Sequence, residues 1–198
     1  MEQSLPQKYA ALFIDAPNIA HQHIAGNEDH RVSIKDIDWE ALVKHMLASL
    51  EADYFVFLGT AYTFAGDGRK DTADWLEESL RRGLGRYRGK VRTFVRSRKD
   101  IDNAIVNDMW VCYHRMCRER EERGALAPHE ITFLLAAGDG GYADPVGSIR
   151  EFFGQKVDLR LHTFSWGGSL SGELSRMSQR VELLDHVAPL LIKPAFAL

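Results

Sequence analysis

The feature that most constrains the fold is a short apolar run that ends in a carboxylate. Residues 9–14 are apolar without interruption, and Asp15 follows them, with Pro17 close behind. Such a run, bounded by turn residues, is typical of a buried β-strand. A carboxylate directly after it suits the carboxyl edge of a parallel sheet, where open α/β folds place their ligands. Asp15 could equally cap the turn that follows, and this stretch alone leaves both interpretations open.

The rest of the chain alternates between apolar runs and helical periodicity. Further strands are expected over residues 54–60, 91–95, 131–137 and 157–163, and helices over 39–50, 72–84, 101–122, 145–153 and 170–184. Regular alternation of this kind predicts a three-layer α/β/α fold with a mainly parallel sheet of five or more strands. With no repeat and no linker in the pattern, we expect a single domain over residues 1–198.

Composition narrows the class of protein. The chain has 198 residues, of which 45% are hydrophobic and 27% charged, as is ordinary for a globular domain with a proper core. Neither a membrane-spanning run nor a secretory signal stands out in the sequence. The chain has 2 cysteines, five residues apart in one expected helix, and this spacing suits neither a disulfide nor a zinc knuckle. We therefore expect a cytoplasmic protein with no membrane partner; whether it forms a homo-oligomer is left open.

Positive charge is concentrated in one stretch. Nine of the 25 Lys and Arg residues lie within residues 81–99, and no Asp or Glu lies among them, although the whole chain has a formal charge of -3. A basic stretch on an otherwise acidic protein favours a polyanionic partner such as RNA. A solvated surface without a partner is the alternative. Within this stretch, Arg96, Arg98 and Lys99 are the candidate phosphate contacts, and Trp166 is a candidate platform for a base.

Three acidic residues follow expected strands and should meet at one edge of the sheet. Asp15 follows the first strand, Asp102 opens the long helix after the third, and Asp139 follows the fourth. Carboxylates brought together repel unless a cation compensates them, and Mg²⁺ and Mn²⁺ prefer such oxygen ligands. A cation held there can activate water and stabilise charge on a phosphodiester. For Asp102, a role as helix cap is the alternative. Asp108 lies deeper along the helix and is expected to orient a neighbour or to bond to backbone.

Several ordered motifs resemble one known family. Residues 13–18 (Phe-Ile-Asp-Ala-Pro-Asn) are similar to a first strand ending in D-G-x-N, and residues 99–102 (Lys-Asp-Ile-Asp) to K-G-x-D. Residues 135–142 (Leu-Ala-Ala-Gly-Asp-Gly-Gly-Tyr) resemble S-G-D-S-D-F, and residues 169–184 a closing Ser/Leu-rich helix. In this order they resemble the NYN domain, the LabA-like branch of the PIN-like ribonuclease superfamily. The resemblance spans nearly the whole chain and implies a PIN-like, Rossmann-like fold.

The resemblance also implies an activity and its residues. It implies a Mg²⁺- or Mn²⁺-dependent ribonuclease in which Asp15, Asp102 and Asp139 bind the metal and are the catalytic residues. Asn18 would orient Asp15 or contact substrate. Where the family has a second acid two residues after Asp139, this chain has Gly141.

Two other functions compete with the ribonuclease. Loss of the acid at position 141 would suit a catalytically weak or inactive RNA-binding module, unless Asp144 substitutes through water. Residues 138–143 also fit the dinucleotide pattern G-x-G-x-x-A, with Asp158 following at a suitable spacing. Against a dinucleotide site, the turn follows the fourth strand rather than the first, Asp139 lies where the pyrophosphate would sit, and Asp158 falls inside a strand.

Overall fold

The computed structural model describes residues 6–20, 32–64, 70–85, 90–96, 101–122, 124–126, 128–153 and 157–193. Its centre is one six-stranded sheet in the order β3-β2-β1-β4-β5-β6, and every neighbouring pair of strands is parallel. The strands are β1 (Lys8–Asp15), β2 (Tyr54–Phe64), β3 (Lys90–Arg96), β4 (Glu130–Ala136), β5 (Asp158–Ser165) and β6 (Arg180–Leu183). The expected α/β fold with a parallel sheet is confirmed.

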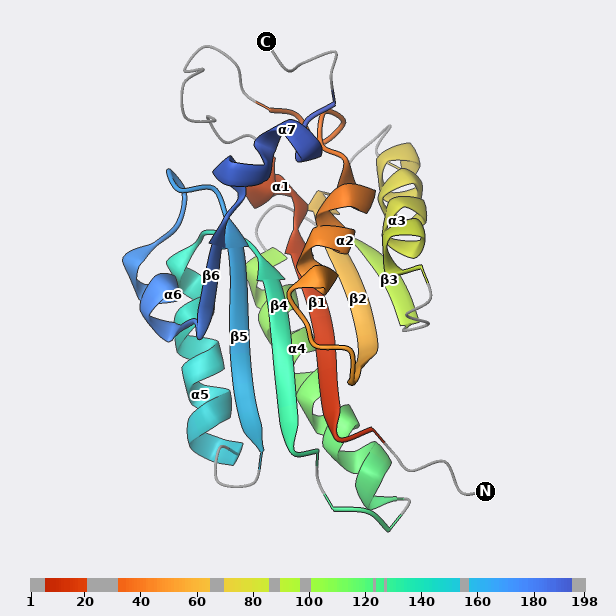
Figure 1. Ribbon diagram of the computed structural model, residues 1–198, viewed down its shortest axis with the longest axis vertical. Helices are drawn as coiled ribbons and strands as arrows, with labels where there is room; N and C mark the ends of the chain where they lie inside the picture. Colours follow the sequence, from red (N-terminus) through yellow and green to blue (C-terminus); the bar gives the residue numbers. More distant parts are fainter. Residues whose placement is uncertain are drawn as a thin grey trace.

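Helices cover both faces of this sheet and complete the three layers (Figure 1). Buried side chains of α1, α2, α3 and α7 form the core on one face, and those of α4, α5 and α6 form the core on the other. The helices are α1 (Ala16–Ile19), α2 (Trp39–Ala48), α3 (Lys70–Leu84), α4 (Ile101–Glu121), α5 (Ala143–Phe153), α6 (Gly172–Met177) and α7 (Ala188–Leu191), with the short 3₁₀ turns η1 (Gly140–Tyr142) and η2 (Leu184–Val187).

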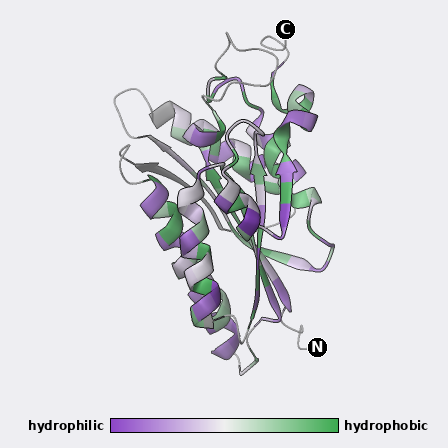
Figure 2. Ribbon diagram, turned by 90° about the vertical axis from the view of Figure 1, so that its left-hand side faces the viewer, coloured by the Kyte–Doolittle hydropathy of each residue, from purple (hydrophilic) through white to green (hydrophobic). Residues whose placement is uncertain are grey.

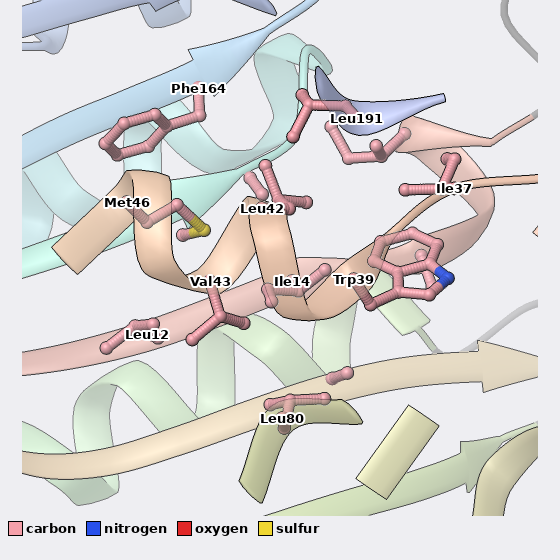
Figure 3. Packing of buried hydrophobic residues seen from close by; sticks show 14 of the residues in the cluster. Leu12, Ile14, Ile37, Trp39, Leu42, Val43, Met46, Leu80, Phe164 and Leu191 are labelled. Carbon is pink, nitrogen blue, oxygen red and sulfur yellow. The ribbon is translucent and has the colours of Figure 1, made fainter. Parts of the chain in front are cut away.

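Strand β1 lies in the middle of the sheet, and this explains its apolar sequence. Successive side chains of a strand point to opposite faces. Leu12 and Ile14 accordingly join the core under α2, whereas Phe13 joins the core under α4. In Figure 3, Leu12 and Ile14 lie beside the side chains of α2, with Phe164 of β5 closing the same cluster. A strand that is buried on both faces has no position for a polar residue until it reaches the edge.

The distribution of hydropathy follows these layers. Viewed from the side, the helices alternate between hydrophilic and hydrophobic residues, as expected when one face of each packs on the sheet (Figure 2). Among the described residues, no helix has both the length and the apolar character needed to cross a membrane.

The expected closing helix over residues 170–184 is wrong. The chain there forms the short helix α6, and then turns into β6, which pairs with β5 from His162↔Arg180 to Ser165↔Leu183. Ser171 caps α6, since its side chain accepts a hydrogen bond from the Leu174 N–H. The resemblance of this segment to a single Ser/Leu-rich helix therefore does not extend to its structure.

Glycine has two different roles at the C-terminal end of α3. Gly83 lies within the helix, and a Cβ built there would approach Val43 Cβ to 2.6 Å. The helix ends at Gly85, whose φ of 51° is in the left-handed region that favours glycine. Gly83 is thus required by the close approach of α2 and α3, and it does not break the helix.

We predict that Gly83→Ala destabilises the protein by about 1–2 kcal/mol, because overpacking outweighs the ~1 kcal/mol that alanine gains in helix propensity. Urea unfolding of the variant measures this change in free energy. The double variant Gly83→Ala/Val43→Gly, which lacks the Val43 Cβ, should be less destabilised than the sum of the two single variants. A Gly83→Ala protein more stable than the wild type contradicts the packing argument.

Candidate metal centre

The site lies where the order of the strands reverses. β2 and β3 lie on one side of β1, and β4, β5 and β6 lie on the other, so that β1 and β4 flank the topological switch point. Ligands of open α/β sheets bind outside the carboxyl ends of the strands at this point. Asn18 spans it, because its Oδ1 accepts a hydrogen bond of 2.7 Å from the backbone N–H of Gly138. The connections that follow β1 and β4 are thereby tied together.

Asp15 is buried at this edge, with 5% of its surface exposed. Its Oδ1 accepts a hydrogen bond of 3.0 Å from the backbone N–H of Asn18, so it caps the short helix α1. Its Oδ2 lies 2.8 Å from the hydroxyl oxygen of Tyr142. The sequence allowed two roles for Asp15, as a cap of the following turn or as a member of an acidic cluster. In the structure its carboxylate has both roles. Asn18 orients it through its backbone, while the Asn18 side chain bonds to Gly138.

Tyr142 joins Asp15 to a second carboxylate. Oδ1 of Asp102, in the first turn of α4, lies 2.8 Å from the same hydroxyl oxygen. A phenol has a single hydrogen, so it donates to only one carboxylate at a time. The contact between the hydroxyl oxygen and the other carboxylate becomes favourable when a second proton, or a cation, lies between them.

Charge and burial act together on this pair. Burial, and to a smaller extent the negative charges of Asp102 and Asp139, raise the pKa of the Asp15 carboxyl to about 6, although the hydrogen bonds from Tyr142 and Asn18 act in the opposite direction. Burial and the charges of both carboxylates also raise the pKa of the Tyr142 phenol, which therefore stays protonated. The Asp15 carboxyl therefore takes up a proton at a higher pH than an ordinary aspartate does.

Asp139 lies within electrostatic reach of Asp15 but points into its own turn. Its Oδ1 accepts a hydrogen bond of 2.9 Å from the backbone N–H of Gly141, and so caps η1. Asp144 is exposed in the first turn of α5. Within the part of the chain that the structure describes, no three His, Cys, Asp or Glu side chains form a group that could hold a metal ion. The structure therefore joins Asp15 and Asp102 through the Tyr142 hydroxyl, and it links Asp139 to Asp15 only through its charge.

Asp108 does orient a neighbour. Its Oδ2 accepts a hydrogen bond of 2.8 Å from the hydroxyl of Tyr62, and Tyr62 pairs with Asp15 in the register of β1 and β2. A second tyrosine–aspartate contact thus lies beside the first, from the strand next to β1. We interpret Asp108 as a support for that end of β2.

The expectation that Trp166 stacks on a base is wrong. Only 1% of its surface is exposed, and its Nε1–H donates a hydrogen bond of 2.8 Å to the backbone carbonyl of Ile19. The indole packs in the core under α2 and satisfies a carbonyl at the end of α1. Of the expected phosphate contacts, Arg96 is the last residue of β3, and the structure describes its backbone alone. Arg98 and Lys99 lie outside the described residues.

The glycine-rich turn after β4 is filled by the chain itself. A Cβ at Gly138 would lie 2.4 Å from the carbonyl oxygen of Ser169, and one at Gly140 would lie 3.1 Å from Ser171 Oγ. These glycines admit the neighbouring loop, which the Ser171 N–H fastens to the Gly138 carbonyl at 2.8 Å. Asp158 is the first residue of β5, at the opposite edge of the sheet, where it forms an ion pair with Arg160. These contacts do not favour a dinucleotide site.

The sequence did not identify Tyr142 as a functional residue. The sequence nevertheless contains an indication. The family motif S-G-D-S-D-F ends in phenylalanine where this chain has Tyr142, and tyrosine differs from phenylalanine only by a hydroxyl. A buried hydroxyl needs a hydrogen-bond partner, and the expected acids at the same edge supply one.

Comparison with known proteins supports the fold alone. No protein-family model matches the sequence, and no curated protein matches it. Among solved structures, the chain is similar to a protein of unknown function from Vibrio parahaemolyticus. The two share 14% sequence identity with a TM-score of 0.57, over 92% of this chain and 96% of the other. The α/β/α architecture is shared with that protein.

We predict that Asp15 makes the folded protein less stable as the pH rises. Its folded-state pKa of about 6 exceeds the ordinary value of 3.8, so the stability it contributes is fully present below pH ~4 and is lost as the pH rises through ~6. Relative to Asp15→Asn, the wild-type free energy of unfolding should fall by about 2–3 kcal/mol between pH 4 and pH 7. Urea unfolding across this range measures the difference. In the control Asp74→Asn, at an exposed position of α3, the difference should stay constant; a constant difference for Asp15→Asn contradicts the prediction.

Proposed function

We propose that the protein is a divalent-metal-dependent ribonuclease whose reaction centre is the edge formed by Asp15, Asp102 and Asp139. The observation that carries the proposal is the meeting of Asp15 and Asp102 on one buried hydroxyl, 2.8 Å from each, at the switch point of a parallel sheet. The two carboxylates come from different elements, and within the part of the chain that the structure describes neither accepts a hydrogen bond from a cationic side chain. The resemblance to the NYN domain assigns the same residues.

The donor set fits a hard cation. Two carboxylate oxygens face one point where a single phenolic hydrogen cannot satisfy both, and Mg²⁺ sites often use only one or two carboxylates together with water. Asp15 and Asp102 would hold the ion, and the charge of Asp139 would add to its attraction. When bound, the cation would supply an activated water and stabilise charge on the phosphodiester. Asn18 would keep Asp15 in place through its backbone N–H.

The choice of RNA as substrate follows from the basic stretch of residues 81–99. β3 ends at Arg96 and α4 begins at Ile101, so the chain enters and leaves this part of the stretch at the carboxyl edge of the sheet. In the sequence, Arg98 and Lys99 lie between these two ends. Contacts between basic side chains and phosphates add affinity without sequence preference, and they weaken as salt concentration rises.

We predict that Asp15→Asn and Asp102→Asn each lower Mn²⁺-stimulated cleavage of a fluorescent single-stranded RNA by about 100-fold or more, because each removes a ligand charge. The matched control Asp74→Asn removes a carboxylate from α3 and should cleave as the wild type does. Cleavage that survives in both site variants would falsify the catalytic assignment.

A second function is favoured by one observation: within the described residues no third acid joins Asp15 and Asp102. In this case the protein is an RNA-binding module without turnover. Binding of the same RNA, followed by fluorescence anisotropy, would then weaken steeply with salt and survive Asp139→Asn, while no cleavage is seen for the wild type.

We predict that Gly141→Asp strengthens Mn²⁺ binding about tenfold, a change of ~1.4 kcal/mol, by returning an acid to the edge. The substitution fits, because a Cβ at Gly141 would meet only Asp139 Oδ1, at 3.5 Å. The control Gly168→Asp adds the same charge where a Cβ meets nothing within 4 Å. Calorimetric titration with MnCl₂ measures both; equal affinities for the two variants contradict a specific role for position 141.

A further inference from the structure

The Tyr142 hydroxyl occupies the point that the two carboxylates share. It lies 2.8 Å from Asp15 Oδ2 and 2.8 Å from Asp102 Oδ1, and the residue is fully buried. Its ring packs in the core under α4 and α5, so the hydroxyl leaves the two carboxylates only if the ring itself moves. Among the described residues, Tyr142 is the group that hydrogen-bonds to both carboxylates.

A cation bound to the same two oxygens would compete with this hydroxyl. Mg²⁺ binds oxygen ligands at about 2.0–2.1 Å, closer than the phenol stands to either carboxylate. The ion would therefore take the place of the hydroxyl between Asp15 and Asp102. A hydrogen bond to a carboxylate is stronger than a neutral one, so losing the bond that Tyr142 donates reduces the affinity for the ion.

We propose that Tyr142 is a positioning residue that holds Asp15 and Asp102 together in the metal-free protein and that a divalent cation must displace. The inference rests on the proposed function, since it takes this pair as the metal ligands. Tyr142 thereby sets the concentration at which the site fills, and it favours the empty state at low metal concentration.

Displacement of Tyr142 also connects the metal to the neighbouring turn. Tyr142 ends η1, which Asp139 caps through the Gly141 N–H. Gly138, at the start of this turn, is held by Asn18 on one side and by Ser171 on the other. A buried ring that leaves its position must move within this anchored segment, so that a signal from the tyrosine itself reports the binding of the ion.

The test is Mn²⁺ binding to Tyr142→Phe, with Tyr54→Phe as the matched control. Tyr54 is also a buried tyrosine, and it begins β2 at the opposite edge of the sheet. Its hydroxyl oxygen lies 3.2 Å from Oγ1 of Thr132 in β4. Calorimetry or electron paramagnetic resonance of free Mn²⁺ measures the affinity. Tyrosine difference absorbance measures the change at the phenol.

Tyr142→Phe should bind Mn²⁺ about tenfold more tightly than the wild type, the change that corresponds to one charge-assisted hydrogen bond. It should also lose the tyrosine difference signal that Mn²⁺ produces, whereas Tyr54→Phe keeps both the wild-type affinity and the signal. A merely structural role would weaken binding in Tyr142→Phe, so tighter binding is specific to the inference.

Two outcomes overturn the inference, and they are distinguishable. If the wild type binds Mn²⁺ and Tyr142→Phe binds it equally or more weakly, Tyr142 does not compete and the proposed ribonuclease stands. If neither protein binds Mn²⁺ at millimolar concentration, both the inference and the metal dependence of the proposed function are wrong.

Discussion

The buried carboxylate at the end of the central strand is the constraint on which the carboxyl edge depends. A charged group without partners in such a place costs several kcal/mol in general, so the chain surrounds Asp15 with donors. The Asn18 N–H and the Tyr142 hydroxyl supply them from α1 and η1. Asn18 then uses its side chain to fix Gly138, which joins the exit of β1 to that of β4. Compensation of one charge thus organises the switch point of the sheet.

Much of the fold could be predicted because the sheet is parallel and buried. A strand with helices on both faces must be apolar throughout, and residues 9–14 therefore identify β1 without further information. The C-terminal part shows the limit of this reasoning. β6 is only partly buried, and its identity depends on backbone pairing with β5, which no local pattern of residues 170–184 reveals. A single expected helix became a helix, a strand and a turn for this reason.

For the acidic edge, the positions of the residues could be predicted, whereas the directions of their side chains could not. Strand exits follow from topology, so the sequence placed Asp15, Asp102 and Asp139 at one edge, as the structure does. The direction of a side chain after a strand ends depends instead on the turn that follows. Trp166 turns inward to the Ile19 carbonyl, and Tyr142 turns inward to the carboxylates. The sequence alone suggested a function only for Trp166, as an exposed platform for a base, and none for Tyr142.

Gly141 shows which properties of the edge the fold does not dictate. The neighbouring Gly138 has no alternative, since any side chain there would meet the Ser169 carbonyl at 2.4 Å. Gly141 is exposed and has ordinary space for a Cβ, so packing does not require a glycine at this position. The number of carboxylates at the edge is therefore independent of the stability of the turn. With Asp139 engaged in capping η1, the chemistry of this edge depends on the two acids that share the Tyr142 hydroxyl.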